Sequence, residues 1–378
     1  MSGIYIHIPF CKQACYYCDF HFSTSLKKKN ELLNALVKEL ELRKDEFHDQ
    51  VVETIYFGGG TPSLLTLEEL QTLLDAIYKN YVVCEHPEIT LEANPDDLTA
   101  HKIMELSQSE INRLSIGIQS FFDDDLKQMN RAHNTNEARN CLEIATKYFD
   151  NITIDLIYGI PDMSLEKWNE NLKIAFNYGV NHISSYALTV EPKTALSAFI
   201  KNGSYPPIDE ALALEHFNHL VDETQKHGFV HYEISNFGKP NYFSKHNTSY
   251  WKGLAYVGIG PSAHSFKNSK RSWNISNNSK YIQAIHEHRL PNTVEVLSIE
   301  DQYNEYVMTG LRTVWGISLN EIEERFGLKF KTHTLDSSEK FIKESLLSLE
   351  INDSKTTIRT TKKGKFLIDG IASELFMI

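Results

Sequence analysis

The stretch Ile4-Tyr-Ile-His-Ile-Pro-Phe-Cys11-Lys-Gln-Ala-Cys15-Tyr-Tyr-Cys18 joins a β-like run to three closely spaced cysteines. A short loop can fold sulfurs at CxxxCxxC spacing around one soft metal centre. A cubic iron–sulfur cluster normally takes four thiolates. If only three are offered, one iron stays open and can bind and reduce a small molecule. The stretch therefore indicates a metal centre directly after a first strand.

The same spacing permits two other uses of these cysteines. Zinc could take the three sulfurs together with His21, which gives a Cys3His site. A disulfide framework is disfavoured, because a chain of 378 residues with five cysteines and no secretory signal is typical of a reduced, intracellular protein. On local spacing alone, the cluster and the zinc site both remain open.

Composition and charge narrow the class of protein. A hydrophobic fraction of 41% is ordinary for a globular chain and allows two or three domains. The formal charge of -12 does not favour a nucleic-acid partner. No apolar run is long enough to span a bilayer, and the first residues carry no basic leader. We therefore expect a cytoplasmic protein that does not bind nucleic acid.

Strand-like and helix-like stretches alternate over the first 190 residues, which predicts parallel βαβ units. The expected strands are Ile4–Pro9, Glu53–Phe57, Glu88–Glu92, Arg113–Ile118, Ile152–Tyr158 and His182–Ala187. The expected helices between them are Leu26–Lys44, Leu67–Asn80, Ala100–Ser107, Glu137–Tyr148 and Leu165–Tyr178. Six units predict an α/β fold with an open or partial (β/α)6 barrel rather than a full barrel of eight.

Polar or glycine-rich residues coincide with the ends of these strands, where barrel chemistry gathers. In strand order they are Cys11, Gly58-Gly59-Gly60-Thr61, Glu92, Gln119, Asp155 and Ala187. The glycine run lets backbone N–H groups approach an anionic carboxylate, but it lacks the Gly-Lys-Ser/Thr ending of a P-loop. Gly258-Ile-Gly260 resembles part of a dinucleotide-binding fingerprint, but no predicted βαβ unit surrounds it, so a Rossmann-type site is disfavoured.

Two further segments complete the chain. Residues 191–293 are expected to be an irregular, aromatic-rich extension of the core (residues 1–190), with one long helix at Asp209–His227. Residues 294–378 are expected to form a smaller unit of helices at Ile299–Thr313, Leu319–Phe326 and Ser337–Leu349 with a hairpin. This unit resembles a winged helix without a basic recognition helix, so we interpret it as a structural or partner-binding lid.

Several motifs in order resemble the radical S-adenosylmethionine superfamily, and more narrowly the family of the oxygen-independent coproporphyrinogen III dehydrogenase. They are the CxxxCxxC stretch, Gly58-Gly59-Gly60-Thr61-Pro62, Ser115-Ile-Gly-Ile-Gln119-Ser, Asn130-Arg131, Ile154-Asp155-Leu-Ile-Tyr-Gly-Ile-Pro161 and Tyr186-Ala187-Leu. The resemblance covers roughly the first 270 residues well and the rest more loosely.

The resemblance implies a [4Fe–4S] cluster on Cys11, Cys15 and Cys18, with S-adenosylmethionine chelating the open iron. The residues that it implies as contacts of S-adenosylmethionine are Tyr5, Tyr17, Gly59, Gly60, Thr61, Glu92, Gln119, Arg131, Asp155, Ala187 and His264. Such contacts are chemically reasonable, since carboxylates accept from ammonium or ribose hydroxyl groups and arginine pairs with carboxylate.

The chain departs from the dehydrogenase in two places. The dehydrogenase has an extra cysteine just beyond the third ligand, where this chain has Asp19-Phe20 after Cys18, and it has an extension before the first strand. Lys245-His246-Asn247-Thr-Ser-Tyr250-Trp251 instead matches the HNxxYW pattern of the HemW-type branch, which is regarded as heme chaperones. This match implies heme contacts at His246, Asn247, Tyr250 and Trp251, since histidine is a common heme ligand and aromatic rings can stack on a macrocycle. A histidine merely hydrogen-bonded in an aromatic core is the alternative.

The leading hypothesis is thus a heme chaperone that binds heme and hands it to an acceptor apo-haemoprotein, with a [4Fe–4S] cluster, S-adenosylmethionine and heme as its bound groups. Contact with a membrane surface would suit a chaperone that serves membrane haemoproteins. The alternatives are oxidative decarboxylation of coproporphyrinogen III, or radical chemistry on an unrelated substrate.

Overall fold

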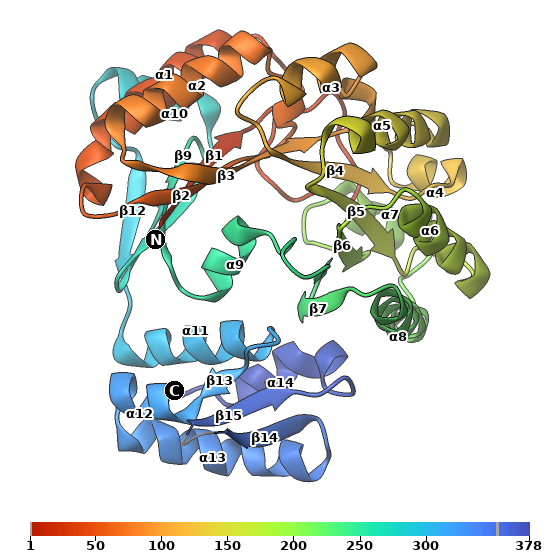
Figure 1. Cartoon of the computed structure of the whole chain (residues 1–378), viewed down its shortest axis with the longest axis vertical. Coiled ribbons are helices and arrows are strands. Elements are labelled where there is room, and N and C mark those ends of the chain that lie inside the picture. The colour runs from red at the N-terminus through yellow and green to blue at the C-terminus, as the bar shows by residue number, and fades with distance from the viewer. Residues whose placement is uncertain (1, 353–354) are drawn as a thin grey trace.

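The computed structural model describes residues 2–352 and 355–378, and a long, mostly parallel β-sheet lies at its centre (Figure 1). Six strands lie side by side in chain order, each parallel to the next. They are β1 (Ser2–Ile8), β2 (Val52–Gly59), β3 (Val83–Ala93), β4 (Arg113–Gln119), β5 (Ile152–Tyr158) and β6 (His182–Ala187). Each overlaps one predicted strand, which confirms the α/β class and the partial six-unit barrel.

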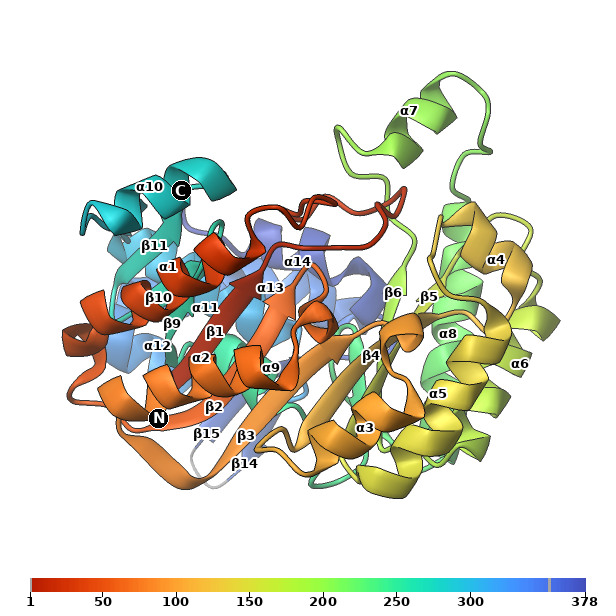
Figure 2. The same ribbon diagram turned by 90° about the horizontal axis from the view of Figure 1, so that it is seen from above.

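Helices cover the convex face of this sheet (Figures 1 and 2). The covering helices are α1 (Lys29–Leu42), α2 (Leu67–Asn80), α3 (Ala100–Ser107), α4 (Asp123–Gln128), α5 (Thr135–Tyr148) and α6 (Leu165–Asn177). In β1 the side chains of Ile4, Ile6 and Ile8 are fully buried in the hydrophobic core. Because side chains alternate along a strand, Tyr5 and His7 project to the opposite, concave face.

Residues 191–293 extend the sheet at both ends, so the expectation of an irregular segment is wrong. Among the described residues the sheet reaches twelve strands in the order β12-β11-β10-β9-β1-β2-β3-β4-β5-β6-β8-β7. The added strands are β7 (Val230–Glu233), β8 (Asn236–Gly238), β9 (Ala255–Ile259), β10 (His264–Lys267), β11 (Lys270–Asn274) and β12 (Asn292–Val296). Their helices are α7 (Ala195–Lys201), α8 (Glu210–Lys226), α9 (Lys245–Trp251) and α10 (Asn278–His286). Strands of three to five residues carry too little alternation to be recognised.

The boundary expected between residues 293 and 294 falls inside β12, which pairs with β11 of the core sheet. The C-terminal unit therefore begins with α11. It contains α11 (Ile299–Leu311), β13 (Ile317–Ser318), α12 (Leu319–Phe326), α13 (Leu328–Lys343), β14 (Leu347–Asn352), β15 (Lys355–Thr360) and α14 (Ile368–Glu374). This order is that of a winged helix, and the unit has its own hydrophobic core around Tyr303 and Ile358. Short 3-10 helices cover Lys44–Phe47, Pro62–Leu64, Pro95–Asp97 and Lys365–Leu367.

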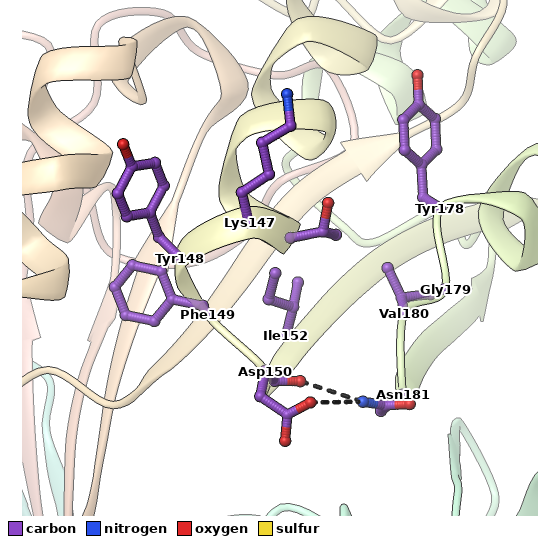
Figure 3. Close-up of a pocket in the computed structure, with 10 residues that line it drawn as sticks. Lys147, Tyr148, Phe149, Asp150, Ile152, Tyr178, Gly179, Val180 and Asn181 are labelled. Atoms are coloured by element: carbon purple, nitrogen blue, oxygen red, sulfur yellow. Dashed lines mark hydrogen bonds between the residues drawn. The ribbon is translucent and has the colours of Figure 1, made fainter.

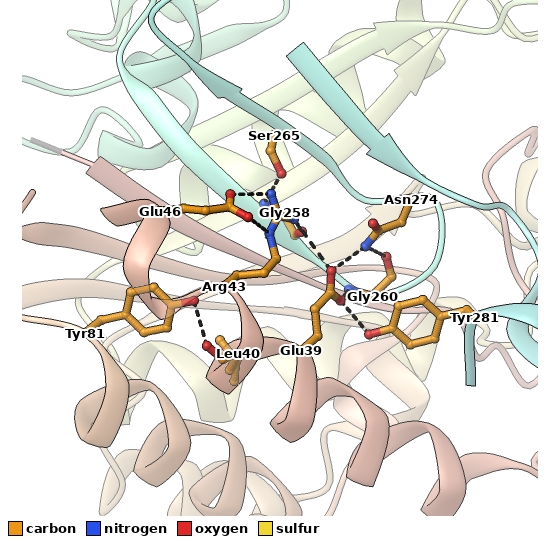
Figure 4. A network of polar contacts seen from close by, with 10 residues as sticks. All are labelled: Glu39, Leu40, Arg43, Glu46, Tyr81, Gly258, Gly260, Ser265, Asn274 and Tyr281. Atoms are coloured by element: carbon orange, nitrogen blue, oxygen red, sulfur yellow. Dashed lines mark hydrogen bonds and ion pairs between the residues drawn. The ribbon is translucent and has the colours of Figure 1, made fainter. Parts of the chain in front are cut away.

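A buried ionic network fastens the added strand β9 and helix α10 to α1 (Figure 4). The Glu39 carboxylate accepts hydrogen bonds from Gly260 N (2.8 Å), Asn274 Nδ2 (2.7 Å) and Tyr281 Oη (2.5 Å). Arg43, one helical turn later, lies 3.6 Å from Glu39 and donates to the Gly258 carbonyl oxygen at 2.8 Å. Burial raises the pKa of Glu39. Loss of any one partner would leave a buried charge or donor uncompensated, so the network stabilises the fold only when it is complete.

No helix within the described ranges has the length and apolar character needed to cross a membrane.

We predict that Glu39→Ala lowers the free energy of unfolding by about 3 to 5 kcal/mol, because Arg43 and three buried donors lose their acceptor. Urea denaturation of the full chain measures this change. Glu41→Ala, which removes an exposed carboxylate paired only with Lys38, is the matched control and is expected to cost less than about 1 kcal/mol. Equal effects of the two substitutions would contradict the role of the network.

Candidate functional site

The three cysteines lie on the loop that follows β1. Figure 2 shows this loop beyond the carboxyl ends of the central strands. All three are half-buried free thiols. Burial raises the pKa of Cys11 and raises that of Cys18 to about 11, so these two stay protonated unless a cation replaces their protons. Helix α7 packs on the loop, with Leu196 N donating to the Tyr16 carbonyl oxygen at 2.8 Å. Three soft donors on one supported loop fit an iron–sulfur cluster.

The zinc alternative does not fit the loop as well. His21 is turned to α10, where its Nε2 lies 2.7 Å from Asn278 Oδ1. Across residues 2–352 and 355–378, no three His, Cys, Asp or Glu side chains stand in the geometry of a single metal ion. The candidate fourth zinc ligand, His21, is therefore engaged by α10.

Arg131 connects the cysteine loop to the ends of β3 and β4. Its Nη1 lies 3.3 Å from Cys15 Sγ and 3.5 Å from Tyr17 Oη, and its Nη2 donates to Asn94 Oδ1 at 2.6 Å. The Nε–H of Arg131 is buried and has no hydrogen-bond partner among the described residues. An unpaired guanidinium N–H beside the sulfurs can donate to a bound carboxylate. Gln119, at the end of β4 in a left-handed conformation (φ 63°), brings its amide to the same place.

The glycine-rich loop and Glu92 form the next part of the site. The Glu92 carboxylate accepts from Tyr56 Oη at 2.7 Å and from Gly59 N at 3.2 Å. Burial raises the pKa of Glu92. Gly59 has φ 110°, and a Cβ there would strike the His7 ring, so only glycine fits. The predicted residues Thr61 and Gly60 follow directly, and Thr61 Oγ1 accepts from Asn94 Nδ2 at 3.2 Å.

Asp155 lies on β5, facing Glu92 across the concave surface. Burial, together with the Glu92 charge, raises the pKa of Asp155 to about 7. Arg113, fully buried at the start of β4, partly offsets these two carboxylates and donates to Thr153. A cation such as the sulfonium or ammonium of a bound ligand would be favoured between Glu92 and Asp155.

Three more predicted contacts surround this region. Tyr5 projects from β1, with its Oη 3.1 Å from His7 Nδ1. Ala187 ends β6 and is half-buried. His264 is exposed at the start of β10, stacked on Trp273 with ring centroids 6.0 Å apart. The structure thus brings the predicted cysteines, glycines, Glu92, Gln119, Arg131 and Asp155 to one end of the sheet, and leaves His264 at the margin.

The predicted heme segment lies at the other end of the strands. Helix α9 rests on the concave face against the starts of β1 and β2, inside the arc of the sheet (Figure 1). A Cβ on Gly3 would meet the His246 ring at 3.1 Å, whereas Cys11 lies beyond the far end of β1. The two ends of β1 are separated by roughly 20 Å, at about 3.3 Å per residue. Sequence order gave no sign of this separation.

His246 is 1% exposed and has both ring nitrogens occupied. Its Nδ1 lies 2.7 Å from Thr54 Oγ1 and its Nε2 2.7 Å from Tyr250 Oη. Burial, with the Arg113 charge, lowers the pKa of His246 to about 3, so the imidazole is neutral. In this structure the ring has the hydrogen-bonded core environment that was the alternative to a free ligand. Asn247, Tyr250 and Trp251 are half-buried on the same helix.

Four residues that the sequence did not single out hold this end together. Thr54 and Tyr56 come from β2, and the Tyr56 ring stacks on His246 with centroids 4.9 Å apart. Glu88 accepts from the first two backbone N–H groups of α9, at 3.2 and 3.1 Å. His182 repeats the His246 arrangement, with Nδ1 3.0 Å from Thr153 Oγ1 and Nε2 2.8 Å from Tyr232 Oη. The sequence signal that could have identified Thr54 and Tyr56 is that both carry a hydroxyl group within a strand predicted to be buried.

Tyr56 links the two ends of the concave face. Its hydroxyl donates to Glu92 beside the glycine loop, and its ring stacks on His246. Tyr250 continues the contact from His246 to Tyr256 of β9, with ring centroids 4.8 and 4.4 Å apart. A continuous run of side chains therefore connects the glycine loop to the far side of α9.

A shallow pocket of about 330 Å³ near the start of β5 lies apart from both ends (Figure 3). Its walls include Lys147, Tyr148, Tyr178 and Asn181, and none of its lining residues was predicted as a site residue. At the base of the pocket, Asn181 Nδ2 donates to the Asp150 carbonyl oxygen at 3.1 Å, so these two polar groups are already paired with each other.

Comparisons with known proteins find relatives along nearly the whole chain. The sequence model of the Radical SAM superfamily matches residues 5–175, and that of the HemN C-terminal domain matches residues 297–367. The protein named heme chaperone HemW of Bacillus subtilis is 34% identical, with 97% of each chain covered. That of Lactococcus lactis is 33% identical over 98% of each, and that of Escherichia coli is 37% identical over 69% of each.

Among solved structures, coproporphyrinogen III oxidase (HemN) from Escherichia coli superimposes with a TM-score of 0.84. The superposition covers 100% of this chain and 90% of that one, at 23% identity. At that identity the likeness establishes the fold alone.

We predict that Asp155→Asn stabilises the protein without added ligands at pH 8 by about 2 to 4 kcal/mol and has little effect near pH 4. A carboxyl whose folded-state pKa is raised to about 7 costs stability as pH rises from about 4 to 7, because only the unfolded state ionises freely over that range. Urea denaturation across this pH range measures the difference. Asp336→Asn on the exposed surface of α13 is the control. A difference in the free energy of unfolding between Asp155→Asn and the parent that does not vary with pH would contradict a buried, titrating carboxyl at this position.

Proposed function

This chain belongs to the HemW family of heme chaperones, and we propose that it binds one heme per chain and passes it to an apo-haemoprotein. The observation that carries the proposal is the placement of the His246–Trp251 segment. It lies on the concave face, in side-chain contact with the region of Glu92 and the glycine loop through Tyr56. The heme segment and the cofactor end therefore share one face of the sheet.

The scaffold would hold a [4Fe–4S] cluster on Cys11, Cys15 and Cys18. S-adenosylmethionine would lie between that loop and the strand ends. When bound, a cluster with one open iron supplies a position at which S-adenosylmethionine can be chelated and reduced. We assign the unpaired Nε–H of Arg131 to the carboxylate of S-adenosylmethionine, and Glu92 and Asp155 to its positive groups. Tyr5, Tyr17, Gly59, Gly60, Thr61, Gln119, Ala187 and His264 complete the proposed surroundings.

Heme ligation by His246 would require one local rearrangement. Nε2 of His246 is held by Tyr250 alone, whereas Nδ1 is held by Thr54 from the strand. Turning the Tyr250 hydroxyl away would free Nε2 and leave the ring oriented by Thr54. The lost hydrogen bond subtracts about 1 kcal/mol from heme binding. This lower affinity suits a carrier, because weaker heme binding speeds the release of heme to the acceptor.

Heme is the cargo, and the acceptor is an apo-haemoprotein whose identity the sequence does not specify. We place the exchange in the cytoplasm, with contact at a membrane surface where the acceptor is membrane-bound. Coproporphyrinogen III decarboxylation is the alternative function, and the absence of a cysteine at Asp19 or Phe20 disfavours it.

We predict saturable binding of hemin at one per chain, weakened at least about tenfold in His246→Ala, which equals about 1.4 kcal/mol. The reason is loss of the nitrogen ligand. Anaerobic titration followed by optical spectra measures it. His182→Ala is the matched control, because it deletes an equally buried imidazole between a threonine and a tyrosine.

The two variants should lose similar folding stability, but only His246→Ala should change the heme spectrum. Equal hemin affinity and spectra in both would remove His246 as a ligand. If the unsubstituted protein fails to bind hemin, the chaperone proposal fails, and turnover of coproporphyrinogen III becomes the next assay.

We also predict that Cys15→Ala loses the iron and sulfide of the reconstituted protein while hemin binding stays within about twofold, since the cysteine loop and α9 lie at opposite ends of β1. Iron and acid-labile sulfide analysis, beside hemin titration, measures both. Cys141→Ala, in the buried face of α5, is the control and should keep its cluster. Parallel loss of cluster and heme in Cys15→Ala would mean that the two sites are one.

A further inference from the structure

A cleft of about 690 Å³ opens between the core and the C-terminal unit, on the far side of α9 from His246. Its core wall comes from the end of α9 and from β9 and β10, and its other wall from α11, α12 and the turn before β13. Figure 1 shows α9 directly facing α11 across this gap. The volume falls within the usual range for ligand sites of about 300 to 1,000 Å³.

Building on the proposed chaperone function, we propose that this cleft, named here the interdomain cleft, is where the heme macrocycle binds. The chemical class of ligand is an iron porphyrin with two propionates. Three features of the cleft support this placement: its walls, its charges and its route to the iron.

The walls are aromatic on both sides. Trp251 and Tyr256 face the cleft from the core, and Tyr306 and Trp315 face it from the C-terminal unit. A flat macrocycle between two walls gains from stacking on such rings. Trp251 is also held from across the boundary, because the Arg312 guanidinium lies 5.6 Å from its ring centroid. Both walls are therefore positioned before a ligand enters.

Basic side chains line the cleft, although the chain as a whole carries a formal charge of -12. Lys252 Nζ lies 4.8 Å from the Trp315 ring centroid, and Lys252 forms no ion pair within the described chain. Arg325 lies 5.1 Å from the Tyr306 ring centroid and pairs with Glu321 at 2.8 Å. Arg271 pairs with Glu305 across the boundary. Glu305 and Glu321 also line the cleft and neutralise the two arginines, so Lys252 is the cation that suits a propionate group.

The route to the iron passes through Tyr250. Its ring lines the cleft while its hydroxyl holds His246 Nε2 at 2.7 Å. Among the described residues that line the cleft there is no histidine, but the His246 imidazole is in direct contact with the lining residue Tyr250. A macrocycle seated against Trp251 would bring its iron to the side chain that covers this nitrogen. The cleft and the HNxxYW segment are thus parts of one site.

The test is anaerobic hemin titration of the full chain with two matched pairs of variants. Trp315→Ala should weaken binding about tenfold by removing one aromatic wall, and Trp315→Phe should restore most of the affinity. Trp273→Ala, which removes a half-buried tryptophan beside His264 outside the cleft, should bind hemin as the parent does. Lys252→Glu should weaken binding about tenfold, and Lys280→Glu on α10 should not.

Hydrogen exchange gives a readout that does not depend on any variant folding. Hemin should slow exchange in backbone segments 248–256 and 302–316, which form the two walls. Saturable binding with unchanged affinity in Trp315→Ala and Lys252→Glu, and protection confined to the cysteine loop, would overturn the cleft but leave the chaperone function. Absence of any saturable hemin binding by the parent would overturn the proposed function itself.

Discussion

The need to pair every buried polar group on the concave face of the sheet determines most of this structure. Parallel strands usually bury apolar side chains on both faces. Here Thr54, Tyr56, Glu92, Arg113 and Asp155 stand on the inner side instead. Buried polar groups are stable only when hydrogen-bonded, so the face must be completed by partners from elsewhere in the chain. Helix α9 supplies these partners at one end, and the glycine loop supplies them at the other.

This pairing explains why a segment almost 250 residues from the N-terminus is fixed against β1 and β2. Glu88 holds the first turn of α9, Thr54 holds the His246 ring, and Ser244 caps the helix by accepting from Asn247 N at 3.3 Å. Seven residues form too short a helix to be stable alone. The sheet therefore orders the HNxxYW segment, and the segment in turn covers the polar face.

The sequence predicted the regular half of the molecule and only part of the site. Six strands of Ile, Val and Tyr were long enough to be recognised, and residues at their carboxyl ends met as parallel strands require. Strands β7 to β11 were missed because each is short and is stabilised by neighbours distant in sequence. The burial of His246 could not be predicted either, because its own segment does not show that Thr54 and Tyr56 of β2 contact its ring. Helix α13 begins at Leu328, nine residues before the expected start, because Gly327, with φ 94°, separates it from α12.

The covered state of His246 bears on how a carrier can bind and release the same ligand. An imidazole fully open to solvent would bind ferric heme with no internal competitor, whereas here the Tyr250 hydroxyl competes for Nε2. The nitrogen has a partner in both states, whereas the Tyr250 hydroxyl gives up its hydrogen bond when heme binds. The competition costs heme affinity about as much as one hydrogen bond, and the same hydrogen bond is regained when heme leaves. Because Thr54 keeps the ring in place throughout, exchange needs motion of Tyr250 alone, and the strands that hold the cysteine loop can stay as they are.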